Sequence, residues 1–411
     1  MSGAFAGADR LRALVDRAFD DATRGARVGS AEHLLLADFL ACVKGAGPAA
    51  APQGWRNDGT AGSAAALGVR AHTLDQDDIH WMAGIHPGSV VWPVVLALGA
   101  ESSVDGEQVA ASARAGYNCM AGLAALLGPT HARSWHATAT CGAVGAAAAA
   151  AVLLGLGDEQ RLWACGHAVA VAGGVGQAIV ERSGTAAFHR AACAVTGIQA
   201  ARLAQANVRS SRNVLDGERG VLALFHVEPT NVSDAQAVAT LPTTSVRLYP
   251  VNGFAQAAVA LAADLRQRAR ADATSLLVEV SDFVATATTG VPGGAWWDLR
   301  HAVAAAWSTG DPFDLEPTAD SVACRDHVRI VAGTVGRGTT RVTAKTPRGD
   351  LVAQADSPPG LLLSDPRLAP ELDHKWNRLA GALHVRELAD LFLSRGPRRP
   401  DLLQLLESPT T

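Results

Sequence analysis

Two apolar segments rich in alanine and glycine, each preceded by a histidine, constrain the fold of this chain most strongly. The first follows His86 as PGSVVWPVVLALGA, and the second follows His136 as ATATCGAVGAAAAAAVLLGLG. Segments with so few polar residues are typical of helices that are covered on every face. The most apolar run, residues 143–157, is shorter than the roughly 20 residues that a membrane-spanning helix needs. We therefore expect buried helices that begin at these two histidines.

Composition and charge exclude several classes of protein. The chain has 411 residues, of which 48% are hydrophobic, which is enough to bury two domains. The net charge of −4 indicates neither a nucleic acid nor an anionic membrane as a partner. The six cysteines are scattered without a C-x-x-C pair, so we expect reduced thiols and no metal site. The charged N-terminus lacks the apolar core of a secretory signal, which favours a cytoplasmic protein.

The pattern of the sequence changes twice along the chain. Apolar residues recur at helical spacing up to about residue 231, whereas short β-branched runs between Gly/Pro turns, with one helix from Phe254 to Arg270, fill residues 240–362. Amphipathic helix returns near the end. These changes predict an all-helical domain over residues 1–235 plus 365–411, and a lid domain over residues 236–364. The predicted fold class is mainly α with a smaller α/β (α+β) lid domain.

Both histidines occupy positions suited to acid–base chemistry. Imidazole transfers protons well because its ordinary pKa lies near the working pH of most enzymes. Pro87 suits the first turn of a helix, and the three acids Asp75, Asp77 and Asp78 stand just before the His-Pro-Gly turn. Because a nearby carboxylate can fix the tautomer and raise the pKa of an imidazole, one of these acids is expected to orient a base.

Motifs along most of the chain resemble those of one known family. They are AHTLDQDD at 71–78, HPG at 86–88, GYN at 116–118, WHAT at 135–138, VLDGERG at 214–220, RLYP at 247–250 and ELDHKWNRLAG from 371. In this order they resemble the MmgE/PrpD family, which includes 2-methylcitrate dehydratase, cis-aconitate decarboxylase and iminodisuccinate epimerase. The resemblance implies a two-domain architecture with the active site in the cleft between the parts, no cofactor, and a homodimer.

The resemblance also implies roles for individual residues. His86 and His136 match the two active-site histidines of the family, and Asp75 matches an aspartate that lines the pocket. His189 is retained, but the lysine that usually precedes it falls on alanine. The lid histidine of the family falls on Asn252 or Gln256, and the family tyrosine is replaced by His301, whose imidazole could donate a proton instead.

His189 and Gln256 are candidates for substrate binding, and so are further residues beside these motifs. Arg133 is expected to hold an anionic substrate or to keep His136 neutral by repulsion, unless it is a solvated helix end. His80 is expected either to face the pocket or to lie in a surface loop. Tryptophans close to the site motifs would line an apolar pocket or simply pack: Trp81, Trp135, Trp296 and Trp297.

The missing cations limit the substrate. Because unpaired carboxylates are costly to bury, a site that lacks the family lysine and lid histidine is expected to reject citrate-like ligands. The sequence thus predicts a cofactor-independent lyase, of dehydratase or decarboxylase type, that transfers a proton beside a carboxylate or carbonyl of a small, non-tricarboxylate metabolite. An isomerase, epimerase or cyclase on the same scaffold remains an alternative. So does a catalytically degenerate binding subunit.

Overall fold

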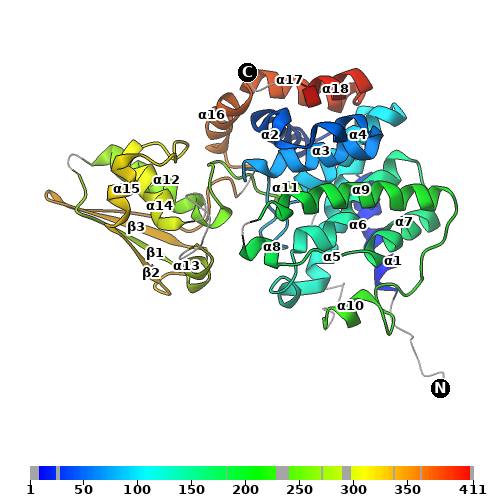
Figure 1. Cartoon of the computed structure of the whole chain (residues 1–411), viewed down its shortest axis with the longest axis horizontal. Coiled ribbons are helices and arrows are strands. Elements are labelled where there is room, and N and C mark those ends of the chain that lie inside the picture. Colours follow the sequence, from blue (N-terminus) through cyan, green and yellow to red (C-terminus); the bar gives the residue numbers. More distant parts are fainter. Residues whose placement is uncertain are drawn as a thin grey trace. The chain divides into compact units, whose positions relative to one another are not determined.

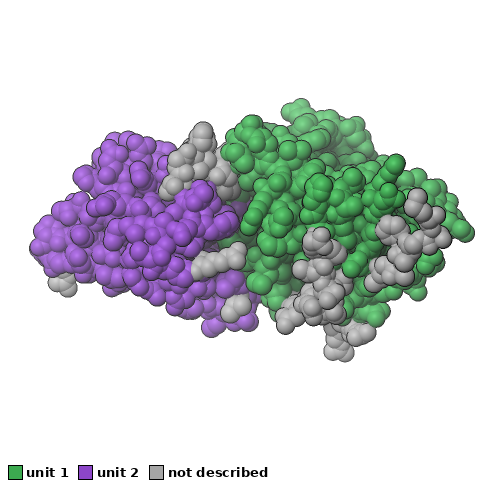
Figure 2. Space-filling view, turned by 90° about the horizontal axis from the view of Figure 1, so that it is seen from below, with its two compact units in different colours: residues 1–245, 376–411 green, residues 246–375 purple. Residues whose placement is uncertain are grey.

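The computed structural model divides the chain into two compact units, shown in Figure 2. Unit 1 comprises residues 1–245 and 376–411, and unit 2 comprises residues 246–375. The structure describes residues 9–24, 28–181, 183–227, 240–269, 272–288, 298–336, 338–361 and 363–407. Unit 1 is helical and unit 2 combines helices with a small mixed sheet, which confirms the predicted fold class.

Unit 1 is an assembly of helices in which distant parts of the chain pack together (Figure 1). Its helices are α1 (Arg10–Arg24), α2 (Ser30–Ala46), α3 (Gly59–Thr73), α4 (Gly88–Ser102), α5 (Gly106–His131), α6 (Ala137–Leu153), α7 (Asp158–Ala170), α8 (Gln177–Val180), α9 (Thr185–Gln205), α10 (Val221–Leu224), α11 (Thr240–Thr243), α17 (Ala382–Arg395) and α18 (Arg399–Glu407), with short 3-10 turns at Pro48–Ala50 and Gln53–Asn57. As predicted, α4 and α6 begin directly after the His86-Pro87 pair and after His136.

Helix α6 forms the centre of unit 1 because its small side chains let neighbouring backbones come close. It packs against α4, α5, α7 and α9, and almost all of its residues are buried. A Cβ added to Gly116 of α5 would lie 3.0 Å from the carbonyl oxygen of Gly145 in α6, and one added to Gly197 of α9 would lie 2.3 Å from Cβ of Ala146. Glycine at these crossings therefore sets the distance between the helices.

The C-terminal part of the chain returns to unit 1. Helix α16 (Leu368–Leu379) contains the boundary between the units, and α17 then packs against α2 and α5. The indole Nε1 of Trp376 donates a hydrogen bond of 2.9 Å to Oδ1 of the buried Asp38 in α2. Among the described residues, no helix has the length and apolar character needed to cross a membrane.

Unit 2 is built on a four-stranded sheet of order β2-β1-β3-β4. Its strands are β1 (Ser275–Val280), β2 (Val328–Ala332), β3 (Thr340–Thr346) and β4 (Gly349–Ala355). Strand β1 pairs in parallel with β2 (Leu276 opposite Val328) and antiparallel with β3, and β3 and β4 form a hairpin. Alternate residues of β1 are buried, as expected for a sheet with one covered face.

Helices pack against the sheet and against one another. They are α12 (Gln256–Arg268), α13 (Asp282–Thr288), α14 (Leu299–Thr309) and α15 (Ala319–Arg325), with a 3-10 turn at Gly253–Ala255. Helix α12 packs on β3 and β4, and α14 packs on β2 and on α12. Figure 1 shows α12, α14 and α15 on the same side of the sheet.

Candidate active site

The loop between α3 and α4 carries the largest part of the candidate site. Two backbone bridges fold it, one between Ile79 and Ser245 and one between His80 and Ile85. Asp75 begins the loop with a φ of 52°, in the left-handed region that aspartate tolerates better than most residues. The three acids of this loop are all buried: the exposed fraction is 8% for Asp75, 3% for Asp77 and 5% for Asp78.

His86 is held in one tautomer by the backbone of this loop. Its Nδ1 lies 2.7 Å from the carbonyl oxygen of Asp78. A carbonyl can only accept, so Nδ1 carries a proton, and in the neutral ring Nε2 carries the lone pair. The backbone N–H of His86 donates to Oγ1 of Thr138, 3.1 Å away in the first turn of α6. Two elements therefore position a ring that can accept a proton at Nε2.

The carboxylate of Asp78 supports the turn below His86. Its Oδ1 accepts the backbone N–H of Gly88 at 2.8 Å, and its Oδ2 accepts the hydroxyl of Tyr117 at 2.7 Å. A Cβ on residue 88 would lie 2.6 Å from Oδ2, so this close approach requires glycine. Burial raises the pKa of Asp78 to about 7. The His-Pro-Gly turn thus rests on a buried acid.

Asp77 joins three cationic or titratable groups. Its Oδ1 lies 3.0 Å from Nδ1 of His72, and its Oδ2 lies 3.6 Å from Nε of Arg190 and 3.9 Å from Nδ1 of His86. Asp75 is more distant, with 4.0 Å between its Oδ1 and Nδ1 of His72. Of the three acids, Asp77 therefore makes the shortest carboxylate contacts with the histidines.

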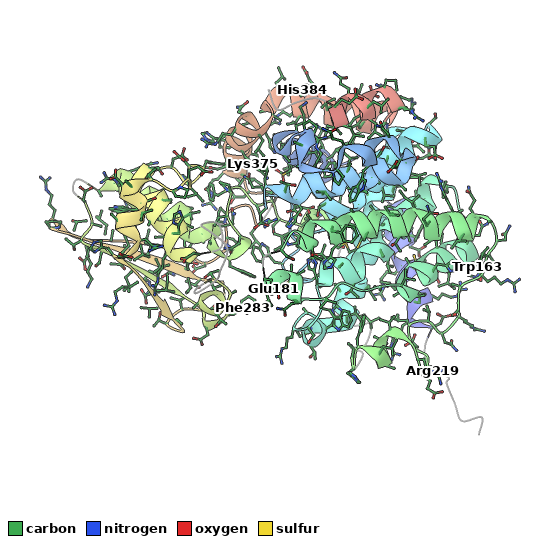
Figure 3. The ribbon with its side chains drawn as sticks, in the orientation of Figure 1. Trp163, Glu181, Arg219, Phe283, Lys375 and His384 are labelled. Carbon is green, nitrogen blue, oxygen red and sulfur yellow. The ribbon has the colours of Figure 1, made fainter. Side chains whose placement is uncertain are left out.

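His136 and His189 form a pair at the starts of α6 and α9. Their Nδ1 atoms lie 2.9 Å apart, and their ring centroids are 5.1 Å apart. The backbone N–H of His136 donates to the carbonyl of Gly174 at 2.8 Å, which fixes His136 at the cap of α6. Between α7 and α9 lies α8, whose C-cap residue Glu181 is labelled in Figure 3. The pair thus joins residues that are 53 positions apart.

Burial and neighbouring positive charges keep His136 neutral. Burial is the largest cause that lowers its pKa well below the ordinary range, followed by the charges of Arg190, His189, His86 and His72. Burial, followed by Arg190, also lowers the pKa of His189. The ring centroids of His72 and His86 lie 6.1 Å apart, and the backbone of His86 contacts Thr138, two residues after His136, so these histidines gather in one region of unit 1.

Two candidate binding residues have their polar groups occupied by hydrogen bonds within the protein. Nδ1 of His80 accepts the backbone N–H of Ala83 at 3.3 Å, and its Nε2 lies 3.2 Å from Oγ1 of Thr243. Gln256 of unit 2 accepts from the backbone N–H groups of 248 and 249 and donates to the carbonyls of 249 and 251, all within 3.0 Å. We therefore assign both side chains to loop structure rather than to substrate binding.

The other predicted residues take varied positions. Arg133 is exposed, and the guanidinium that lowers the pKa of His136 belongs to Arg190 instead. Trp81 is half-buried in the α3–α4 loop, while Trp135 packs 4.6 Å from the ring of Phe225. His301 of unit 2 lies in the first turn of α14 with 7% of it exposed. Trp296 and Trp297 lie outside the described residues.

Buried His301 keeps one polar atom without a hydrogen bond among the described residues. That atom is Nε2, and the backbone N–H of the same residue donates to Oδ1 of Asp298 at 3.2 Å. Burial lowers the pKa of His301. The ring is therefore held neutral, with its Nε2 buried.

One cluster of described residues has the composition of a cation site. Ligand-type atoms of His72, Asp75 and Asp77 all lie within 4.8 Å of one another. Arg190 already faces Oδ2 of Asp77 at 3.6 Å and offsets its charge. We therefore assign the cluster to the positioning of histidines rather than to a metal.

Sequence reasoning missed His72, Tyr117 and Arg190 as members of this region. His72 and Tyr117 lie in motifs that were recognised, AHTLDQDD and GYN, but nothing local indicated their contacts. Arg190 directly follows His189, so its position next to a retained histidine was the one available signal.

Comparisons with known proteins bear on the family of this chain. The model of the MmgE/PrpD N-terminal domain matches residues 29–233, the part of unit 1 that contains the α3–α4 loop, His136 and His189. No curated protein matches the chain. The motifs, the fold class and the family match together lead to one assignment. The chain belongs to the MmgE/PrpD family.

Proposed function

We propose that the chain is a cofactor-independent lyase of dehydratase or decarboxylase type. It would act by transferring a proton at a carbon next to a carboxylate or carbonyl. The observation that carries this proposal is the hydrogen bond from Nδ1 of His86 to the carbonyl of Asp78, which assigns the lone pair to Nε2. Membership of a family that is generally enzymatic supports a catalytic role.

The first step assigned to this site is removal of a proton from carbon. Nε2 of His86 accepts it, and the electron pair of the broken C–H bond moves into the neighbouring carbonyl or carboxyl group. Asp77, with its Oδ2 3.9 Å from Nδ1 of His86, favours the positive charge that then appears on the ring. His86 is the base in this scheme.

The negative charge that develops on the substrate needs a donor that is already in place. His136 supplies it as a neutral imidazole, since burial and the charge of Arg190 disfavour the imidazolium form. A neutral imidazole N–H can stabilise an enolate-like oxygen without first giving up its proton. Loss of a β-hydroxyl then gives dehydration, and loss of carbon dioxide followed by protonation gives decarboxylation.

The charges around the site favour a substrate with few carboxylates. Arg190, the cation described beside the histidines, is 1% exposed and faces Asp77. Its charge is therefore already offset, and a second or third substrate carboxylate would be buried without compensation. We propose a monocarboxylate or a carbonyl compound as the substrate.

Epimerisation is the second candidate, and one observation favours it. His86 and His136 lie at the starts of two helices that are joined by the hydrogen bond from the His86 backbone to Thr138, so we propose that both imidazoles reach one carbon. Removal of a proton by one ring and return by the other would invert the carbon. The buried acid Asp78 argues against a degenerate binding subunit, because strongly perturbed acids gather at functional sites.

One experiment tests this function. Purified protein is incubated in heavy water with β-hydroxy and β-keto monocarboxylates, with 2-methylcitrate and with cis-aconitate, and products are analysed by mass spectrometry. We expect deuterium at carbon with a monocarboxylate, and a loss of about 10²–10⁴-fold for His86→Gln. The control is His384→Ala, which removes an exposed histidine of α17, labelled in Figure 3. Equal incorporation by wild type and His86→Gln would overturn the proposal.

A further inference from the structure

The contact between His136 and His189 fixes the number of protons between the two rings. At 2.9 Å the Nδ1 atoms are within hydrogen-bond distance, so one Nδ1 donates and the other accepts. When His189 donates, the proton of a neutral His136 is on Nε2. When His136 donates, its Nε2 carries a lone pair instead. The position of a single shared proton therefore decides whether His136 acts as an acid or as a base.

The shared proton explains how a neutral His136 can donate a proton to the substrate. A histidine that donates a proton usually does so as imidazolium, and that form of His136 is disfavoured by burial and by Arg190. If His189 supplies a proton to Nδ1 of His136 while His136 releases one from Nε2, His136 never has to become an imidazolium. His189 is the more accessible of the two for this purpose: both residues are half-buried, and fewer protein atoms surround the ring of His189 than that of His136.

We propose that His136 and His189 form a two-imidazole proton relay in which His189 connects the reacting centre to solvent. The inference rests on the proposed function and assigns His189 a proton-transfer role rather than a role in holding substrate. It follows from the Nδ1–Nδ1 contact and from the placement of the two rings at the starts of α6 and α9.

The relay balances at every step. A proton from water forms a bond with Nε2 of His189, while the Nδ1–H bond of His189 breaks and its proton joins Nδ1 of His136. The Nε2–H bond of His136 breaks at the same time, and that proton joins the substrate. One proton enters and one leaves, so both rings end neutral with exchanged tautomers. The reverse sequence moves a proton from substrate to water and restores the first state.

The shared proton can be tested without any substrate. In protein labelled with ¹⁵N at histidine, two-bond ¹H–¹⁵N spectra distinguish Nδ1–H from Nε2–H tautomers, and His136→Asn and His189→Asn assign the signals. We expect Nδ1 protonation to be divided between His136 and His189 near neutral pH, and His136 to settle in one tautomer in His189→Asn. Two fixed Nε2–H tautomers in the wild type would leave no proton between the Nδ1 atoms and would overturn the relay.

Turnover gives the second test. In the heavy-water experiment, His189→Ala should lower deuterium incorporation about 10²-fold, and added imidazole should restore part of the loss. A relay predicts this rescue because free imidazole can carry the proton, whereas a purely structural histidine would not be replaced by it. His384→Ala should show neither the loss nor the rescue.

The two proposals fail in different ways. If wild-type protein incorporates no deuterium from any compound, the proposed function is wrong, and the tautomer measurement still decides on the shared proton. If the wild type incorporates deuterium and His189→Ala does so equally fast, or loses activity without rescue at an unchanged melting temperature, the relay alone is wrong.

Discussion

Arg190 of α9 faces Asp77 of the α3–α4 loop, with 3.6 Å between its Nε and Oδ2 of the carboxylate. Both side chains are buried, and the guanidinium also donates to Oγ of Ser89 at 3.1 Å and to the carbonyl of Ala186 at 2.6 Å. This one cation therefore neutralises the acid beside His86 and lowers the pKa of His136.

Replacement of Arg190 by methionine should affect stability and the histidines together. Removal of one partner of a buried ion pair typically costs about 3–5 kcal/mol, because the other charge stays uncompensated. Since Arg190 is the largest cause after burial that lowers the pKa of His136, that pKa should rise in the variant. Urea unfolding measures the first effect, and a pH titration of the ¹⁵N signals measures the second.

Arg190→Lys serves as the matched variant for this prediction. Lysine keeps the charge, but its single ammonium group cannot donate to both the hydroxyl of Ser89 and the carbonyl of Ala186 in the geometry of the guanidinium. We expect the pKa of His136 to stay low while stability still falls. A pKa for His136 that is the same in Arg190→Met and in wild type would contradict the electrostatic role of Arg190.

Tyr117→Phe should weaken the support below His86. The variant leaves Oδ2 of the buried Asp78 without its hydroxyl donor, and an unsatisfied buried acceptor costs about 1–3 kcal/mol. Because the Tyr117 hydrogen bond lowers the pKa of Asp78, its loss should raise that pKa further. Chemical unfolding of wild type and variant at neutral pH gives the difference, and identical unfolding curves would show that the bond contributes nothing.

Gly88→Ala tests the fit between the His-Pro-Gly turn and Asp78. An added Cβ would lie 2.6 Å from Oδ2 and 2.8 Å from Cγ of Asp78, so the carboxylate must move and the backbone carbonyl that orients His86 moves with it. We expect lower turnover in the heavy-water assay and a lower melting temperature. Gly54→Ala is the control, because a Cβ there meets nothing within 4 Å. Equal behaviour of the two variants would contradict the model of a tight turn.

Local patterns were sufficient to predict the starts of the central helices. Pro87 and the apolar segments behind His86 and His136 are local signals, and α4 and α6 begin where those signals indicate. The spacing of apolar residues likewise predicted a helical part and a smaller α/β part, because a helix or strand that is buried on one face repeats its apolar residues with the period of that element. These features depend on neighbours within a few residues.

Contacts between distant residues could not be predicted in the same way. The His136–His189 pair joins helices that are adjacent only because Gly197 and Ala146 allow α6 and α9 to touch. The family resemblance pointed to Asp75, yet Asp77 lies closer to His72. The direction in which each side chain of a loop points follows no repeating pattern, so the sequence could not show which aspartate would face the histidines. Gln256 was expected to bind substrate, but its amide instead caps backbone groups of residues 248–251.

His80 should make the protein less stable in mild acid. Burial lowers its pKa to about 4, against 6.5 for an ordinary histidine, so the unfolded chain binds a proton more readily than the folded one. The stability linked to His80 is therefore fully present above pH 6.5 and is lost as the pH falls through 4, by an amount on the order of 3 kcal/mol. The pKa of buried His131 is also lowered to about 4, so His131 likewise reduces the stability of the protein in acid.

His80→Gln keeps a donor near Thr243 and removes the titration. The difference in unfolding free energy between variant and wild type, measured in urea from pH 7.5 to 4.5, should shift in favour of the variant as the pH falls. A difference that stays constant over this range would show that the His80 ring is protonated in the folded protein as easily as in the unfolded chain.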